Sequence, residues 1–310
     1  MKRHAKTLLK VAISLGLILF LLSRIDVHAL ADNLARANPW WLAATVILFA
    51  LSILLRAWRW RVLTDARGMG VSFWQLARWY YIGTFFNKLL PTGFGGDVAK
   101  SVYLARETGD AGGAVGTVAL DRFLGILVLL GIGAAAAPFS QARISIWVQL
   151  FVLAAFFAAL AGFWVLRQKS WMRWLHRQAL ALLPGAISHR IEGMASLRSL
   201  YFALQDYDKR TLARAIAVSF IFNLSWILIN ITAGLALGVQ ASLLDYLIFT
   251  PLVSLALLIP SIGGIGVREL SYVGLFTQIG VPAETAFAMS IVIYLATVVS
   301  GLIGGVLLLF

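Results

Sequence analysis

The chain has 310 residues, of which 61% are hydrophobic and 13% are charged. Soluble domains contain roughly 45–50% apolar and about 25% charged residues, so this composition excludes a soluble enzyme and predicts a polytopic membrane protein. The absence of cysteine excludes disulfides, thiolate metal sites and cysteine nucleophiles. A net charge of +13 would suggest a nucleic-acid partner in a soluble protein. In a membrane protein it indicates cytoplasmic loops that face anionic lipid, and we expect no nucleic-acid partner.

Motifs for metal or nucleotide binding are missing from the sequence. The four histidines lie outside the expected spans and show neither H-x-x-x-H nor H-E-x-x-H spacing, so no metal site is expected. The glycines at 93–96 lack the spacing of a dinucleotide-binding loop, and no P-loop Gly-Lys-Ser/Thr is present. We therefore expect no cofactor, and a transporter without an ATP-binding motif is favoured over an enzyme.

Six apolar runs are long enough, or nearly long enough, to cross the ~30 Å hydrocarbon layer. They lie at about 8–22, 39–55, 114–137, 144–166, 212–237 and 285–309. Four Lys and Arg residues, at positions 2, 3, 6 and 10, mark the start of the first run, and no cleavage site follows it, so we predict an uncleaved span with a cytoplasmic N-terminus. On this interpretation residues 1–310 form a single transmembrane domain.

The charges of the connecting segments predict the orientation of the spans. Segment 24–38 has balanced charge and is expected to be an outside loop. The span at 39–55 ends at a basic cluster expected inside, which consists of Arg56, Arg59, Arg61 and Arg67. Segment 167–214 carries nine Lys and Arg residues against three acidic residues. We predict that it is cytoplasmic and includes an amphipathic helix on the anionic lipid surface, and that the C-terminus is also cytoplasmic.

Both ends of segment 72–98 are expected inside, so it must cross the membrane an even number of times. A re-entrant pair meets this requirement, with one helix entering at about 74–89 and another returning from about Asp97. We interpret the residues between them as a break, formed by Pro91, Gly93, Gly95 and Gly96. Unwound backbone at membrane depth must be surrounded by protein or water, so a cavity is implied.

A second interruption of the same character lies within 243–280. An apolar run at 243–259 is separated from a short expected helix at 267–279 by Pro260, Gly263, Gly264 and Gly266. With a one-residue shift, both breaks show two apolar residues, Pro, Ser or Thr, and then Gly-Gly. The two pairs enter from opposite sides, which suggests an inverted repeat around a midplane site of the kind that transporters use.

Polar and ionisable side chains border both breaks. Charged groups near membrane depth are costly, and they are usually functional or paired with one another. The substrate-binding candidates are therefore Asn87, Lys88, Asp97, Asp121, Arg122, Arg268 and Glu269. A structural role is the alternative: Asp97 and Glu269 would cap the new helices, and Asn87 would hydrogen-bond backbone freed at the break.

One further polar stripe lies within the span at 212–237. Asn223, Trp226 and Asn230 recur at i, i+3 and i+7, and thus share one face of a helix. Such a stripe predicts hydrogen bonds to neighbouring helices rather than contacts with a substrate.

Three stretches of the sequence carry a family resemblance. They are Asn87-Lys88-Leu89-Leu90-Pro91-Thr92-Gly93-Phe94-Gly95-Gly96-Asp97, Ala119-Leu120-Asp121-Arg122, and Ile259-Pro260-Ser261-Ile262-Gly263-Gly264-Ile265-Gly266-Val267-Arg268-Glu269. In this order they resemble the transmembrane region of lysylphosphatidylglycerol synthases, a flippase-like membrane protein family. The resemblance implies an all-α polytopic fold of about six full spans plus two re-entrant helix pairs around a lipid-accessible cavity. Because the sequence stops at Phe310, we expect a stand-alone member without the synthase domain.

The resemblance also implies a function. We expect a lipid translocase that moves a polar-headgroup lipid, either a phospholipid or a polyprenyl-phosphate-linked lipid, between the leaflets of the bacterial cytoplasmic membrane. Lys88, Arg122 and Arg268 would hold the phosphate, while Asp97 and Glu269 would contact a cationic or hydroxylated headgroup or carry a coupling proton.

Two other functions stay open at this point. One is an integral-membrane lipid-modifying transferase that uses a carboxylate such as Asp97 or Glu269 as a base. The other is a non-transporting subunit of a lipid or envelope biosynthesis complex. The sequence also leaves open whether the chain forms a homo-oligomer.

Overall fold

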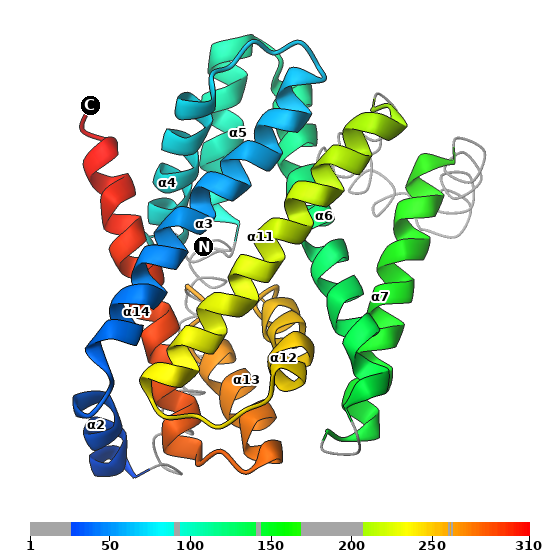
Figure 1. Cartoon of the computed structure of the whole chain (residues 1–310). Helices are drawn as coiled ribbons and strands as arrows, with labels where there is room; N and C mark the ends of the chain where they lie inside the picture. Colours follow the sequence, from blue (N-terminus) through cyan, green and yellow to red (C-terminus); the bar gives the residue numbers. More distant parts are fainter. Residues whose placement is uncertain (1–25, 90–93, 141–143, 169–206, 260, 262) are drawn as a thin grey trace, which may run out of the picture.

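The computed structural model describes residues 26–89, 94–140, 144–168, 207–259, 261 and 263–310. All regular structure in these ranges is helical (Figure 1). The helices, in chain order, are α2 (Val27–Ala35), α3 (Pro39–Asp65), α4 (Phe73–Leu89), α5 (Gly95–Thr108), α6 (Ala111–Ala136), η1 (Ala137–Phe139), α7 (Ile146–Arg167), α11 (Lys209–Ala236), α12 (Leu243–Ala256), α13 (Val267–Phe276), η2 (Thr277–Ile279) and α14 (Ala283–Leu307).

Five of the described helices are long and apolar enough to cross a membrane: α3, α6 continued by η1, α7, α11 and α14. At ~1.5 Å per residue, each extends about 30 Å or more and matches one of the expected spans. The expected span at 8–22 lies outside the described residues. The structure thus confirms an all-α polytopic membrane protein.

The four helices that flank the two expected breaks are too short to cross. α4 has 17 residues, α5 and α12 have 14 each and α13 has 10, which at ~1.5 Å per residue gives about 15 to 26 Å. The pair α4 and α5 starts and finishes at the end of the bundle that carries the C-terminus, and the pair α12 and α13 does so at the opposite end (Figure 1). This is the arrangement required of re-entrant pairs and of an inverted repeat; their depth in a membrane stays a prediction.

The first break is shorter than the sequence suggested. Gly95 and Gly96 were expected in unwound backbone, but they are buried in the first turn of α5. The reason is a close helix crossing, because a Cβ on Gly96 would lie 2.2 Å from the carbonyl oxygen of Gly83 in α4. The other two residues assigned to this break, Pro91 and Gly93, lie outside the described residues.

The second break does contain non-helical glycines. Gly263, Gly264 and Gly266 have φ angles of 59°, 82° and 84°, which glycine adopts without the steric cost that a Cβ would bring. They form the turn that leads into α13. Pro260 lies outside the described residues. Glycine is therefore used for helix packing at one break and for backbone conformation at the other.

Segment 24–38 contains a helix, α2, where the balanced charge had suggested a loop. The Asp26 side chain accepts hydrogen bonds from the backbone N–H groups of His28 at 2.8 Å and Ala29 at 3.2 Å, which is an N-cap. Leu30 is buried against Phe287 and Ala288 of α14. A cap and one buried apolar contact make this helix, and the charge balance carries no information about either.

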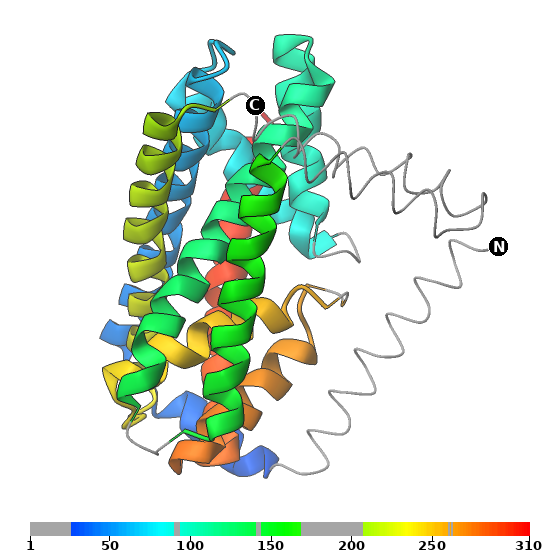
Figure 2. The same ribbon diagram turned by 90° about the vertical axis from the view of Figure 1, so that its right-hand side faces the viewer.

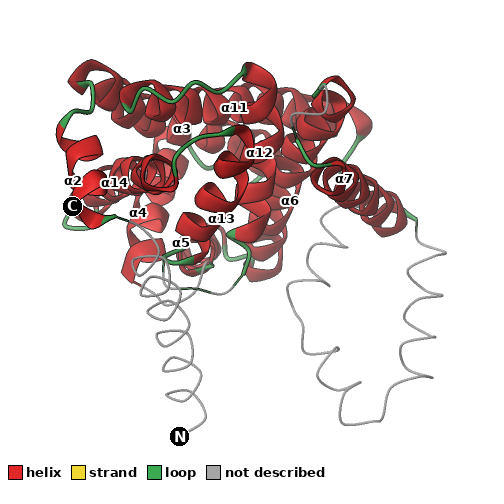
Figure 3. Cartoon of the chain, turned by 90° about the horizontal axis from the view of Figure 1, so that it is seen from below, coloured by secondary structure: helices red, strands yellow, loops and turns green. Residues whose placement is uncertain are grey.

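Helices α3 and α11 pack along each other, and α14 packs against α3, α4 and α13. Helix α7 lies at the edge of the bundle beside α6 in Figures 1 and 3, and it stands in front of the bundle in Figure 2. Most of its side chains are exposed or only partly buried, so much of α7 is available to lipid. Of the basic segment 167–214, residues 169–206 lie outside the described residues and 209–214 form the start of α11.

The polar stripe of α11 joins three helices. Asn223 donates from Nδ2 to the carbonyl oxygen of Gly125 in α6 at 3.0 Å. Trp226 donates from Nε1 to Oγ of Ser254 in α12 at 3.2 Å, and the Tyr272 hydroxyl of α13 donates to Asn230. The predicted interhelical role of Asn223, Trp226 and Asn230 is confirmed.

Replacing Gly96 by alanine tests the crossing of α4 and α5. The added Cβ would meet the Gly83 carbonyl, and we expect a loss of about 1–3 kcal/mol in the free energy of unfolding, as for other overpacked sites. Denaturant unfolding in detergent measures this loss. The matched control is Gly162→Ala in α7, where a Cβ meets nothing within 4 Å and helix propensity favours alanine by up to about 1 kcal/mol. Equal stabilities for the two variants would contradict the crossing.

Candidate functional site

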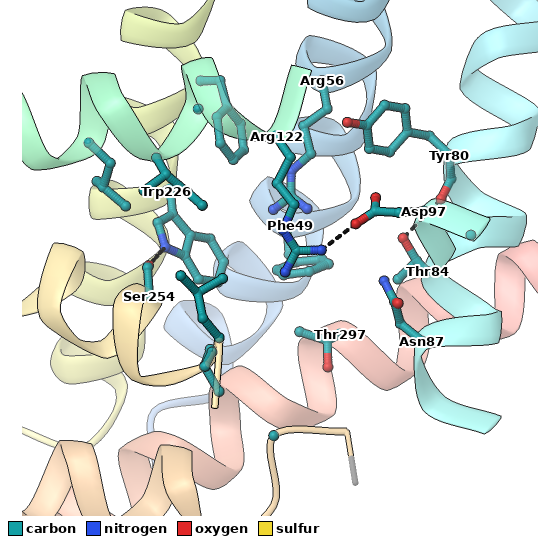
Figure 4. Close-up of a pocket in the computed structure, with 18 of the residues that line it drawn as sticks. Phe49, Arg56, Tyr80, Thr84, Asn87, Asp97, Arg122, Trp226, Ser254 and Thr297 are labelled. Carbon is teal, nitrogen blue, oxygen red and sulfur yellow. Dashed lines mark hydrogen bonds and ion pairs between the residues drawn. The ribbon is translucent and has the colours of Figure 1, made fainter. Parts of the chain in front are cut away.

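A cavity of about 330 Å³ lies in the interior of the bundle (Figure 4). Residues of both helix pairs and of α3, α6, α11 and α14 line it. Six of the seven predicted binding residues are in its wall: Asn87, Lys88, Asp97, Asp121, Arg122 and Arg268. The seventh, Glu269, is buried behind Arg268, with which it forms an ion pair. The break residues Gly263 and Gly264 also border the cavity.

Asp121 is the centre of a buried polar cluster. Its Oδ1 lies 2.6 Å from Nε of Arg59, and the two side chains are 1% and 3% exposed. The Tyr80 hydroxyl donates to the other carboxylate oxygen. Gly125 gives the guanidinium its space, since a Cβ there would lie 2.7 Å from Nη1 of Arg59. Asp121 therefore holds Arg59 in place and has little capacity left for a ligand.

Asp97 joins two further cations. Lys100 places Nζ 3.0 Å from Oδ1 of Asp97, and Arg122 pairs with the other carboxylate oxygen (Figure 4). Arg122 and Asp121 are neighbours in α6 but point about 100° apart, so they serve different partners. Lys100 also lies 3.9 Å from the centroid of the Tyr80 ring, which links the clusters of Asp97 and Asp121.

Two of the predicted binding residues accept hydrogen bonds from backbone N–H groups at the breaks. Oδ1 of Asn87 accepts from the backbone N–H of Gly96 at 2.7 Å. Oε2 of Glu269 accepts from the backbone N–H of Gly266 at 2.6 Å, while Oε1 accepts from Nη2 of Arg268 at 2.7 Å. The structural alternative therefore holds for Asn87 and Glu269. Asp97 lies in the first turn of α5, and its side chain faces cations.

Lys88 and Arg268 come from the two different helix pairs and share one aromatic ring. The Lys88 Nζ lies 4.4 Å from the ring centroid of Tyr294 in α14, and Cζ of Arg268 lies 4.5 Å from the same centroid. The negative face of an aromatic ring stabilises a cation. Tyr294 thus brings these two cations to the same part of the cavity.

Arg56 and Arg59 were not expected at the site, because a basic cluster after an apolar run is typical of a cytoplasmic span end. The structure divides that cluster. α3 continues to Asp65, and only Arg61 and Arg67 lie near its end. Arg56 and Arg59 face the cavity instead. A helical signal existed, since Ser52, Arg56 and Arg59 stand at i, i+4 and i+7 on one face.

Arg56 has aromatic neighbours. Its Cζ lies 4.6 Å from the ring centroid of Phe222, 5.8 Å from that of Phe49 and 5.9 Å from that of Trp226. Its Nε is buried and has no hydrogen-bond partner among the described residues. The Arg56 guanidinium is therefore held by rings and not by a carboxylate in this part of the chain.

The cavity has an excess of positive charge. The cations in its wall are Arg56, Arg59, Lys88, Lys100, Arg122 and Arg268. The carboxylates are Asp97 and Asp121 in the wall and Glu269 behind it, so the formal charge of the group is 6 − 3 = +3. Within the described residues no three His, Cys, Asp or Glu side chains are grouped as metal ligands would be. This excess of positive charge would attract an anion.

Substitution of Asp121 by asparagine tests the central ion pair. The variant leaves Arg59 buried without its counter-charge, and we expect it to lose about 3–5 kcal/mol in the free energy of unfolding. The matched control is Asp65→Asn, which breaks the exposed pair with Arg61 and is expected to change stability by about 0.5 kcal/mol or less. Denaturant unfolding of both variants measures the difference, and a small loss for Asp121→Asn would contradict the pairing.

Comparison with known proteins supports one assignment. The family model of the lysylphosphatidylglycerol synthase transmembrane region matches residues 7–305. A UPF0104 membrane protein of Pyrococcus horikoshii is 24% identical, over 98% of this chain and 97% of its own length. A second, from Methanothermobacter thermautotrophicus, is 26% identical over 87% of this chain and 84% of its own length. No solved structure matches the chain. The chain therefore belongs to the family of the lysylphosphatidylglycerol synthase transmembrane region.

Proposed function

We propose that the protein is a lipid translocase, which moves a lipid with a phosphate-containing headgroup between the two leaflets. The observation that carries the proposal is a cavity of net positive charge inside a bundle of apolar helices. A phosphate loses its hydration in hydrocarbon, and the cations replace part of that hydration. Phospholipids and polyprenyl-phosphate-linked lipids both have such a headgroup.

Arg122 and Arg268 are the proposed phosphate ligands. Arg122 of α6 is 29% exposed. Arg268 lies in the first turn of α13. The two residues come from different helices, and both line the cavity. An arginine presents two parallel N–H donors to a phosphate, which gives both charge and direction. Asp97 and Glu269 orient these guanidinium groups by their ion pairs.

A second hollow provides a place for the acyl chains. This groove, of about 640 Å³, lies between α7, α12 and α13 and is almost entirely apolar. Its lining includes Leu255 and Ala256 of α12, while the next residues, Leu257 and Leu258, line the charged cavity. The end of α12 is therefore shared by the two hollows. We propose that acyl chains lie in the groove while the headgroup occupies the cavity.

The location and orientation predicted from the sequence are kept as part of the proposal. The bundle end that carries the C-terminus also carries the end of α3, the end of α5 and the start of α11 (Figure 1). Basic residues cluster there: Arg61, Arg67, Arg106, Lys209, Arg210 and Arg214. Cytoplasmic loops are enriched in Lys and Arg. This end would face the cytoplasm of a bacterium, with both termini inside and the segment 167–214 against anionic lipid.

The ion pairs favour translocation over chemistry. A lipid-modifying transferase would need a carboxylate free to act as a base. Asp97, Asp121 and Glu269 are each already paired with a cation of the protein. A cationic headgroup would likewise have to displace one of these cations. No observation favours the non-transporting subunit.

Leaflet exchange in proteoliposomes tests the translocase. With a headgroup-labelled anionic phospholipid and a membrane-impermeant quencher, we expect protein-dependent exchange that Arg122→Gln and Arg268→Gln each slow by about tenfold or more, since hydrogen bonds to charged groups contribute ~1.5–3 kcal/mol. Arg61→Gln, an exposed cation outside the cavity, is the matched control and retains the wild-type rate. Wild-type exchange by both cavity variants, correctly folded, would refute the assignment.

Filling the apolar groove tests the acyl path. Gly274 lines the groove and a Cβ there meets nothing within 4 Å, so Gly274→Leu is expected to fold. The leucine side chain would fill part of the groove that we assign to the acyl chains. A lipid would lose ~0.8 kcal/mol of apolar contact for each methylene displaced, so we expect exchange to slow by about threefold or more. Gly162→Leu places the same side chain elsewhere on the lipid-facing surface of α7 and is the control. Equal rates for both variants would contradict the groove assignment.

A further inference from the structure

We infer that the preferred lipid ends in a phosphomonoester or diphosphate, which carries about two negative charges at neutral pH, and not in an aminoacylated or otherwise cationic headgroup. This inference rests on the proposed translocase function and names the substrate class of the same cavity. Each carboxylate of the site is already paired with a cation of the protein. Among the described residues, the cations of Arg56 and Lys88 contact only aromatic rings.

The charges divide into two groups along the cavity. Near α3, α5 and α6 the cavity wall carries four cations, Arg56, Arg59, Lys100 and Arg122, and two carboxylates, Asp97 and Asp121, which leaves a formal charge of 4 − 2 = +2. Near Tyr294, Lys88 and Arg268 face Glu269, which leaves +1. A phosphodiester with one negative charge would leave most of this excess unmatched. A headgroup with two negative charges would leave only one positive charge unmatched, and one with three would neutralise the excess.

Arg56 and Lys88 are the cations we assign to the extra phosphate charge. Arg56 has a buried Nε with no hydrogen-bond partner among the described residues, although a buried donor of this kind is normally satisfied. Lys88 contacts Tyr294 by its cation and lies in the cavity wall. Attraction to a ring is weaker than a charge-assisted hydrogen bond to phosphate. Both side chains can therefore exchange a ring contact for a phosphate oxygen.

The binding of matched short-chain lipids to the purified full chain tests this inference. The probes are dihexanoyl phosphatidic acid, dihexanoyl phosphatidylglycerol and dihexanoyl phosphatidylcholine, which share their acyl chains and differ in headgroup charge. Titration calorimetry in detergent is expected to show that phosphatidic acid binds about tenfold or more tightly than phosphatidylglycerol, and phosphatidylcholine more weakly still. Equal dissociation constants for the first two would overturn the inference.

The variants Arg56→Gln and Lys88→Gln are each expected to reduce this preference by about tenfold, and Arg61→Gln to leave it unchanged. Arg56→Lys keeps the charge and is expected to retain most of the preference, which separates charge from folding defects. Inorganic phosphate is the last probe. If it binds as tightly as phosphatidic acid, the ligand is a free anion and not a lipid, and the inference fails.

Binding and exchange fail separately in this design. A preference for phosphatidic acid without leaflet exchange would support the charge assignment and refute the translocase. Exchange that is equally fast for all three headgroup types would support the translocase and refute the charge assignment.

Discussion

The burial of cations inside an apolar bundle is the constraint on which the rest of this structure depends. An ionised group taken out of water loses several kcal/mol of hydration unless a counter-charge or hydrogen bonds replace it. Asp121, Asp97 and Glu269 supply that replacement for Arg59, for Lys100 and Arg122, and for Arg268. Two of these pairs join different helices, Arg59 of α3 with Asp121 of α6 and Arg122 of α6 with Asp97 of α5. The packing of α3, α5 and α6 around the cavity therefore involves charge as well as apolar contact.

The backbone N–H groups at the two breaks also need hydrogen-bond partners. A helix that ends inside the bundle leaves N–H groups without intrahelical partners. Asn87 binds the N–H of Gly96, and Glu269 binds that of Gly266. Glu269 also holds Arg268, so one carboxylate both closes the start of α13 and orients a proposed phosphate ligand. A structural role and a role in ligand binding are compatible at Glu269. Its carboxylate accepts a backbone hydrogen bond and also orients Arg268, the proposed phosphate ligand.

The helices and most of the cavity could be predicted from the sequence, because apolar length and Gly/Pro interruptions are local signals. Six of the seven proposed residues line the cavity for that reason. Local patterns did not show which side of its helix a charged residue faces when that residue follows an apolar run. Arg56 and Arg61 belong to the same basic cluster in the sequence, yet Arg56 lies among rings and Arg61 in an exposed pair. Partners such as Asp121 for Arg59 are 62 residues apart, and only the fold joins them.

The difference between the cations also bears on how a translocase could release its lipid. A site that neutralised the phosphate too strongly would hold it halfway across the membrane, since passage requires binding that is favourable but reversible. In this cavity the carboxylates already offset half of the six cations, and rings hold Arg56 and Lys88 by contacts of only about 1–2 kcal/mol each. On the proposed function, a departing headgroup would return these two cations to their rings and would leave no bare charge behind. Partial neutralisation would thus lower the barrier for the phosphate without creating a deep well at its midpoint.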